Sequence, residues 1–217
     1  MVNAVTGVLW PMYGKASEEG DWDWIQRTYN SCVSMLIIGG GLVWIVGIIF
    51  SQAIINLWAG PVAYGGLVTA FALGGYVFIS SFGGSNHSLI NGLNPTNIVV
   101  IFGLIEAALN LVISLMLVKS LGIGGVALGT FIASLAVNTW FPPLYIRYRT
   151  QKKVNLELKP ILTHSLIVMT CVILALFIVL YLSACLRFVL GIVIIMVYIA
   201  LLWQVIPDNL QNLIRKT

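Results

Sequence analysis

The chain has 217 residues, of which 59% are hydrophobic and only 8% are charged. A soluble domain carries about 25% charged residues, so this composition excludes an ordinary water-soluble fold. The formal charge of +4 could indicate nucleic-acid binding. The basic residues lie in the gaps between apolar stretches, however, and we therefore exclude nucleic acid as a partner.

Residues 1–14 are apolar but too short to cross a membrane, and they end just before Lys15. We interpret them as the end of a transmembrane helix whose beginning is missing. The chain is then expected to be the C-terminal part of a longer protein, or a truncated reading frame.

Residues 15–30 form the most polar segment of the first half, which we predict to be a cytoplasmic interfacial segment. Ser17 is a candidate N-cap for a short helix. Trp22 and Trp24 are expected to anchor the segment at the membrane boundary, where Trp is enriched.

Six apolar stretches fill most of the remaining chain, and each is close to the roughly 20 residues that a membrane-spanning helix needs. They run over 31–55, 63–82, 97–118, 123–146, 161–183 and 189–206. The sequence predicts an all-α, polytopic integral membrane helical bundle with about six full transmembrane helices and a partial first helix. Residues 31–146 are expected to form a four-helix core, and 161–217 a lipid-facing C-terminal helical pair and tail.

The connections between the stretches carry recognisable break signals. Residues 56–61, NLWAGP, predict a tight outer turn, and the Gly- and Asn-rich residues 82–97 predict an uncharged cytoplasmic loop that contains His87. Pro142 and Pro143 should end or kink the fourth spanning helix.

The charge distribution gives the orientation. Residues 147–160 form a basic loop that contains five of the eleven Lys and Arg residues, which is typical of a cytoplasmic loop. Alternating the other connections from there places nine basic residues inside and two, Lys119 and Arg187, outside. We therefore expect a multi-pass protein whose C-terminus is cytoplasmic.

The third apolar stretch carries a polar stripe. Gly103, Glu106, Asn110 and Ser114 are spaced three, four and four residues apart, which places them on one helix face. A carboxyl group within the membrane costs roughly 2.5–3.5 kcal/mol, so Glu106 should face the bundle interior. Two interpretations stay open: a substrate-contacting or proton-titrating carboxyl in a transport pathway, or a protonated Glu that only hydrogen-bonds a neighbour. The candidate pathway residues are Glu106, Asn110, Ser114 and, in the fourth stretch, Asn138.

Other polar residues give weaker signals. His87 and His164 are isolated, and the three cysteines (Cys32, Cys171, Cys185) lie at different depths. We expect no metal site, no cofactor, no catalytic residues and no enzyme activity. Gly125, Gly129 and Ala133 recur every four residues, which is typical of close helix packing in membranes.

Three segments carry a resemblance to a known family. Residues 11–21 resemble its Pro…Gly-Asp segment, 56–61 its Leu-Trp-x-Gly turn, and 121–134 its Leu-Gly-x-x-Gly-x-Ala helix entry. In this respect the chain is similar to the C-terminal portion of bacterial polysaccharide flippases, the O-antigen and capsule repeat-unit exporters of the multidrug/oligosaccharidyl-lipid/polysaccharide transporter superfamily.

The resemblance implies a function and partners. Such flippases have two lobes of helices around a cavity, and alternating access moves a polyprenyl-pyrophosphate-linked oligosaccharide across the bacterial inner membrane. Their partners here would be that substrate, the lipid bilayer, the missing N-terminal lobe and glycan polymerase machinery. Hinges would be expected at Gly83-Gly84 or Pro142-Pro143.

Two other functions compete with this one. The chain could be a drug/cation antiporter of the same superfamily, with Glu106 as the coupling carboxylate, or a non-transporting structural membrane subunit. A membrane enzyme fits less well, because the predicted outer loops are only about five to seven residues long.

Overall fold

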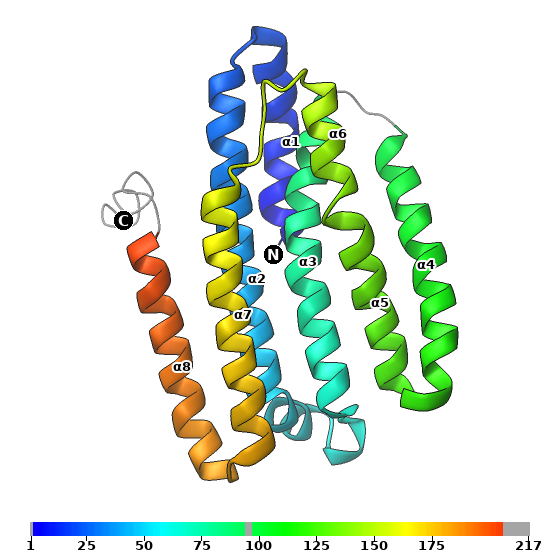
Figure 1. The fold of residues 1–217 in the computed structure, drawn as a ribbon, viewed down its shortest axis with the longest axis vertical. Coiled ribbons are helices and arrows are strands. Elements are labelled where there is room, and N and C mark those ends of the chain that lie inside the picture. Colours follow the sequence, from blue (N-terminus) through cyan, green and yellow to red (C-terminus); the bar gives the residue numbers. More distant parts are fainter. Residues whose placement is uncertain (1, 94–96, 206–217) are drawn as a thin grey trace.

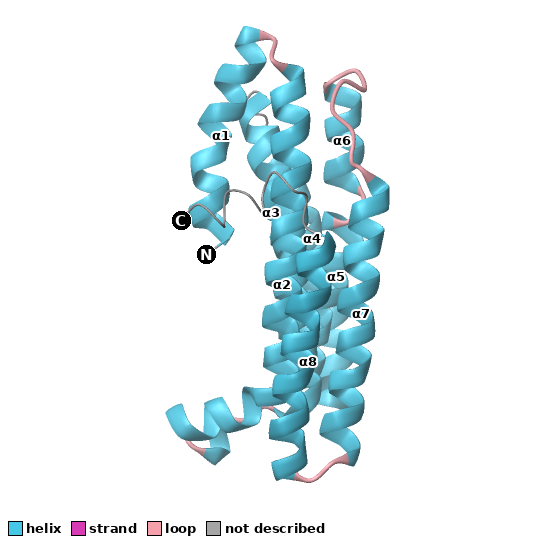
Figure 2. Cartoon of the chain, turned by 90° about the vertical axis from the view of Figure 1, so that its left-hand side faces the viewer, coloured by secondary structure: helices cyan, strands magenta, loops and turns pink. Residues whose placement is uncertain are grey.

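The computed structural model describes residues 2–93 and 97–205. Over these ranges the chain forms α-helices and one short 3₁₀ turn, without a β-strand, so the predicted all-α class is confirmed (Figures 1 and 2). The elements are α1 (Val2–Glu19), α2 (Trp22–Trp58), η1 (Pro61–Ala63), α3 (Gly66–Leu93), α4 (Ile98–Leu121), α5 (Ile123–Asn138), α6 (Phe141–Arg149), α7 (Leu158–Tyr181) and α8 (Ala184–Val205).

Five segments are long and apolar enough to cross a bilayer: α2, α3, α4, the α5–α6 pair and α7. In α8, a sixth apolar stretch covers Leu186–Leu201. The spanning segments run up and down alternately, as Figure 1 shows. The protein is therefore a multi-pass membrane helical bundle.

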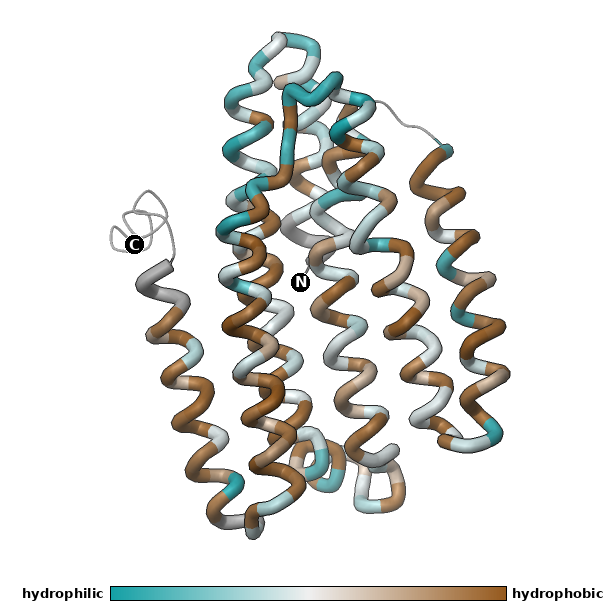
Figure 3. The backbone as a smooth tube through the Cα atoms, viewed as in Figure 1, coloured by the Kyte–Doolittle hydropathy of each residue, from teal (hydrophilic) through white to brown (hydrophobic). Residues whose placement is uncertain are grey.

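The first predicted span is longer than expected. Helix α2 has 37 residues, or about 55 Å at 1.5 Å per residue, whereas the hydrocarbon core is about 30 Å thick. Figure 3 shows where the excess lies: the upper end of the bundle, with the α1–α2 turn and α6, is hydrophilic, and the apolar band lies below it.

The predicted interfacial segment 15–30 is mostly helical. Helix α1 continues to Glu19, Gly20 turns with a positive φ of 76°, and Asp21 caps α2 by accepting a hydrogen bond from the Trp24 amide at 3.0 Å. The predicted cap at Ser17 is therefore wrong. Asp21 takes this role because the αL turn that ends α1 lies at Gly20, directly before it.

The predicted loop over residues 82–97 is also wrong, because α3 stays helical to Leu93. Distant groups bind two of its polar side chains. The Tyr29 hydroxyl donates to Asn86 Oδ1, and the Ser88 hydroxyl donates to the Thr6 carbonyl at 2.7 Å. These tertiary contacts override the low helix propensity of the Gly and Asn residues. Residues 94–96 lie outside the described part of the chain.

Helix α2 is the centre of the bundle. A Cβ atom at Gly40 would lie 3.1 Å from the Phe78 Cα of α3, and the Trp44 indole donates to the Phe71 carbonyl at 2.8 Å. Helix α7 also packs against α2, so the C-terminal pair does not face only lipid, contrary to the prediction. His164 is 1% exposed within this packing.

The basic loop is held against the start of α2. Gln26 and Asn155 exchange two hydrogen bonds of 2.7 Å, and the Glu157 amide donates to Asn30 at 3.0 Å. The Lys153 ammonium lies 4.8 Å from the centre of the Trp22 ring. Trp22 thus makes a cation–π contact with Lys153, in addition to any role in membrane anchoring.

The predicted break at Pro142-Pro143 is confirmed. Helix α5 ends at Asn138, and α6 begins at Phe141 with the two prolines in its first turn, where missing N–H groups are tolerated.

Candidate functional site

A polar seam joins α4 and α5 inside the apolar band. We define it by six residues with matching spacings of four: Glu106, Asn110 and Ser114 on α4, and Thr130, Ser134 and Asn138 on α5. Most of the remaining surface of α4 is exposed and apolar. The polar stripe predicted on α4 therefore faces the neighbouring helix and not the lipid.

Glu106 and Asn138 meet at the upper end of the seam. The Asn138 amide nitrogen donates to Glu106 Oε2 at 3.1 Å and lies 2.9 Å from Ser134 Oγ. Glu106 is eight residues below the start of α4, about 12 Å at 1.5 Å per residue. The carboxyl thus lies within the membrane with one hydrogen-bond partner from another helix, as its burial cost requires.

The lower seam is a packing contact. Ser114 Oγ lies 2.8 Å from Asn110 Oδ1 and 3.2 Å from the Val126 carbonyl, and Thr130 Oγ1 lies 3.2 Å from the same Asn110 oxygen. A Cβ atom at Gly129 would overlap Ser114. Asn110 and Ser114 therefore hold α4 against α5, and the predicted close packing of the glycine motif is confirmed. Gly103, on the same stripe, has open space around it.

The helix break lies directly beside Asn138. Pro142 and Pro143 have no N–H, so the carbonyls of Asn138 and Thr139 lack the donors that a continuous helix would supply. Asn138 Oδ1 and Thr139 Oγ1 are buried and have no hydrogen-bond partner among the described residues. The C-terminal end of α5 also carries partial negative charge. Unpaired acceptor oxygens therefore lie at the α5–α6 break, where the Asn138 side chain also donates to Glu106.

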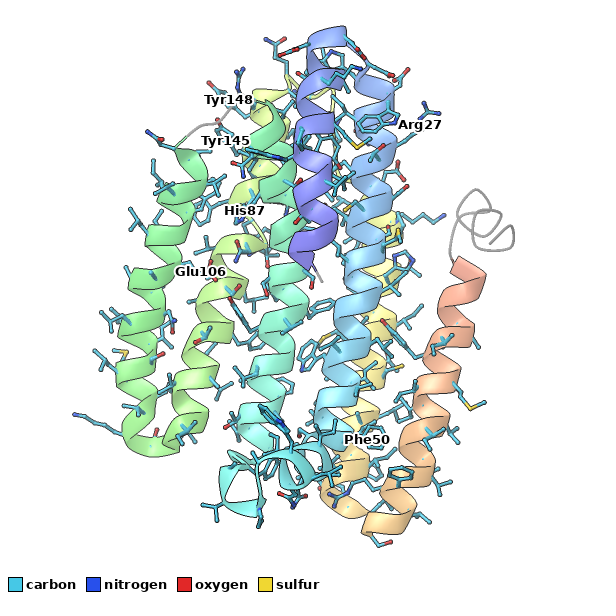
Figure 4. All side chains as sticks on the ribbon, turned by 180° about the vertical axis from the view of Figure 1, so that it is seen from behind. Arg27, Phe50, His87, Glu106, Tyr145 and Tyr148 are labelled. Carbon is cyan, nitrogen blue, oxygen red and sulfur yellow. The ribbon has the colours of Figure 1, made fainter. Side chains whose placement is uncertain are left out.

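His87 lies on the neighbouring helix α3. Figure 4 shows His87 and Glu106 in the upper half of the bundle. His87 Nε2 is buried without a hydrogen-bond partner in the described part of the chain. The side chain lines a cavity of about 390 Å³ between α1, α3 and α4, together with polar Ser88 and Asn91.

The packing of α3 on α5 links these features. A Cβ atom at Gly83 would lie 3.0 Å from Asn138 Cγ, so the two helices are in close contact at the height of the break. A hinge was expected at Gly83-Gly84, but α3 continues through both glycines without a break. The break at 139–140 is the one that lies at the site.

The donor set suits only some ligands. The described residues contain no group of three or more His, Cys, Asp or Glu side chains that could hold a metal ion. The oxygens at the break (Glu106, Asn138, Thr139) are hard donors, which suit a proton or a hard cation and not a soft metal. Cys32 and Cys171 are free and buried, apart from the seam, and nothing is described of the Cys185 side chain.

Several residues of this site were not predicted from the sequence. Thr130 and Ser134 went unnoticed although they precede Asn138 at spacings of four, which is the same signal that singled out Asn110 and Ser114. His87 was assigned to a loop. Its position became clear only once α3 proved helical through residue 93.

Comparison with known proteins assigns no family to this chain. No family model, no curated protein and no solved structure matches this chain. The resemblance to polysaccharide flippases therefore stays a prediction.

Proposed function

We propose that the chain takes part in moving a lipid-linked oligosaccharide across the bacterial inner membrane, as the C-terminal portion of a two-lobed alternating-access flippase. The observation that carries the transport proposal is the Glu106–Asn138 pair at a helix break inside an apolar bundle. Buried ionisable groups at such breaks mark substrate and ion pathways in membrane proteins. We infer the substrate class from the three segments that resemble polysaccharide flippases, at 11–21, 56–61 and 121–134.

The physics of the substrate agrees with this proposal. A glycan cannot enter hydrocarbon, because each hydroxyl buried there without a hydrogen bond costs about 4–8 kcal/mol. Its lipid tail can remain in the bilayer. A protein that moves it must offer a polar path between helices, and the cavity at His87 with the adjacent seam supplies polar groups along α3, α4 and α5.

A cation-coupled drug antiporter of the same superfamily is the second candidate. It is favoured by the unpaired acceptor oxygens of Asn138 and Thr139 at the α5–α6 break, because discontinuous helices with free carbonyls bind coupling ions in other transporters. In that case, Glu106 would release and take up a proton, or bind a cation, in each transport cycle.

Complementation tests the proposal. The complete gene is expressed in a strain that lacks its polysaccharide flippase, and surface glycan is measured together with the amount of protein in the membrane. Restored glycan is the expected result. Normal protein levels without any glycan would contradict the proposal.

Substitution of Glu106 separates the candidates. Glu106→Gln is compared with Glu19→Gln, which removes a surface carboxyl paired with Lys15 at 3.8 Å. Loss of drug efflux in Glu106→Gln alone, with no change in glycan export, would favour the antiporter. If neither substrate is transported by the parent protein, the structural-subunit alternative takes the place of both.

A further inference from the structure

A second polar site lies at the opposite end of the bundle, between α2 and α8. It is a pocket of about 280 Å³ that includes Gln52 and Asn56 from α2 and Arg187 and Phe188 from α8. The pocket is near Phe50, which Figure 4 labels at the lower end of the bundle. This site has no connection to the Glu106 seam.

Local packing shapes the pocket. The rings of Phe50 and Phe188 meet edge-to-face, with their centres 5.4 Å apart. One turn further into α8, a Cβ atom at Gly191 would lie 2.6 Å from Ile49 Cγ2. Close contact at Gly191 fixes α8 against α2, while the longer side chains nearer the end of the bundle leave the pocket open.

Arg187 brings a positive charge that is poorly satisfied. Its Nη1 lies 3.5 Å from Gln52 Oε1 and its Nη2 3.4 Å from the Leu182 carbonyl, both at the long limit of a hydrogen bond. Its Nε is buried without a partner among the described residues. No carboxylate of the described chain lies within 4.0 Å of the guanidinium. A half-buried cation in this state needs an anion.

We propose that this pocket binds the phosphate of an anionic phospholipid. The guanidinium presents N–H donors in the fork geometry that matches phosphate oxygens, and the Gln52 and Asn56 amides add neutral donors.

The surroundings identify the source of the phosphate as a lipid. The surface next to the pocket is apolar and open, with Ile54 53% and Val189 60% exposed, and it would contact acyl chains in a bilayer. The pocket, about 280 Å³, has room for a phosphate and glycerol. An anionic lipid is favoured over a zwitterionic one, because the ammonium of the latter would lie near Arg187 with no acidic side chain to receive it.

Lipid-dependent thermal stability tests this site. The purified full chain in detergent is titrated with short-chain phosphatidylglycerol, with phosphatidylcholine of the same chain length, and with inorganic phosphate. Phosphatidylglycerol should raise the Tm more than either other ligand. The apparent affinity should fall about tenfold in Arg187→Gln, the loss expected for a charge-assisted hydrogen bond.

Lys119→Gln is the matched control, since Lys119 is the basic residue at the α4–α5 turn, at the same end of the bundle but on its opposite edge (Figure 1). It should bind phosphatidylglycerol like the parent chain. An unchanged affinity in Arg187→Gln, an equal loss in Lys119→Gln, or an equal response to inorganic phosphate would overturn the proposal. If Arg187→Gln does not fold, Gln52→Leu keeps the charge and should still weaken binding, and full retention of binding would count against the site.

Discussion

At the residue scale, Glu106 shows how one carboxyl is tolerated within the membrane. Its partner is Asn138 from the next helix, at 3.1 Å, and Asn138 is itself 3% exposed and in contact with Ser134. The pair costs less than an isolated carboxyl because each group replaces part of the hydration that the other has lost. Asn138 Oδ1 keeps an unused acceptor position, which leaves the pair able to take a further ligand.

Substituting Glu106 should separate hydrogen bonding from ionisation. Glu106→Gln keeps an acceptor for the Asn138 amide, so its Tm in detergent should match that of the parent chain. Glu106→Ala removes the acceptor and should destabilise the protein by about 1 kcal/mol, the order measured for hydrogen bonds between membrane helices. Equal Tm values for the two variants would mean that the bond contributes no stability.

At the element scale, the pairing of α4 with α5 depends on small residues. Helix α4 lies at the edge of the bundle in Figure 1 and packs mainly on α5. The contact is close because Gly129 lies against Ser114, and Gly125 lies against the Leu117 backbone. The seam geometry, and with it the Glu106–Asn138 bond, depends on this approach.

A glycine pair tests this dependence. Gly129→Leu should push α4 away from α5 and lower the unfolding free energy by about 1–3 kcal/mol, as overpacked sites do. Gly103→Leu is the control, since nothing lies within 4 Å of a Cβ atom at Gly103. Its Tm, measured in the same detergent, should stay close to that of the parent chain. A similar fall in both variants would show that bulk, and not the α4–α5 contact, is responsible.

The basic loop offers a second test at this scale. Gln26 bonds both the amide and the carbonyl of Asn155, so Gln26→Leu should free the loop and speed its cleavage by trypsin. Gln52→Leu, at the other end of the same helix, makes no contact with the loop and should leave the cleavage rate unchanged. Unaltered cleavage in Gln26→Leu would contradict the role given to this pair.

At the scale of the whole molecule, hydropathy predicted most of the fold, because a span needs only length and apolar composition. The spacing of Glu106, Asn110 and Ser114 also predicted correctly that they share a face. The sequence could not show which helix this face meets. It also could not show that residues 82–93 continue α3, because their partners, Tyr29 and Thr6, lie far away in the chain.

The arrangement of the bundle groups the connections into two ends. The α1–α2 turn and the basic loop lie at the upper, hydrophilic end, while the turns that carry Lys119 and Arg187 lie at the lower end (Figures 1 and 3). The excess of basic residues at the upper end predicts that this end faces the cytosol. The proposed glycan transport relies on this orientation, which would also place the proposed lipid site in the outer leaflet.

Thiol labelling in spheroplasts tests the orientation most directly. Single cysteines are introduced as Lys153→Cys, Lys119→Cys and Arg187→Cys in a chain whose three native cysteines have been replaced, and a membrane-impermeant maleimide is added from outside. We expect labelling at 119 and 187 in intact spheroplasts, and labelling at 153 only after the membrane is opened. Labelling at 153 from outside, with 119 and 187 protected, would contradict the account.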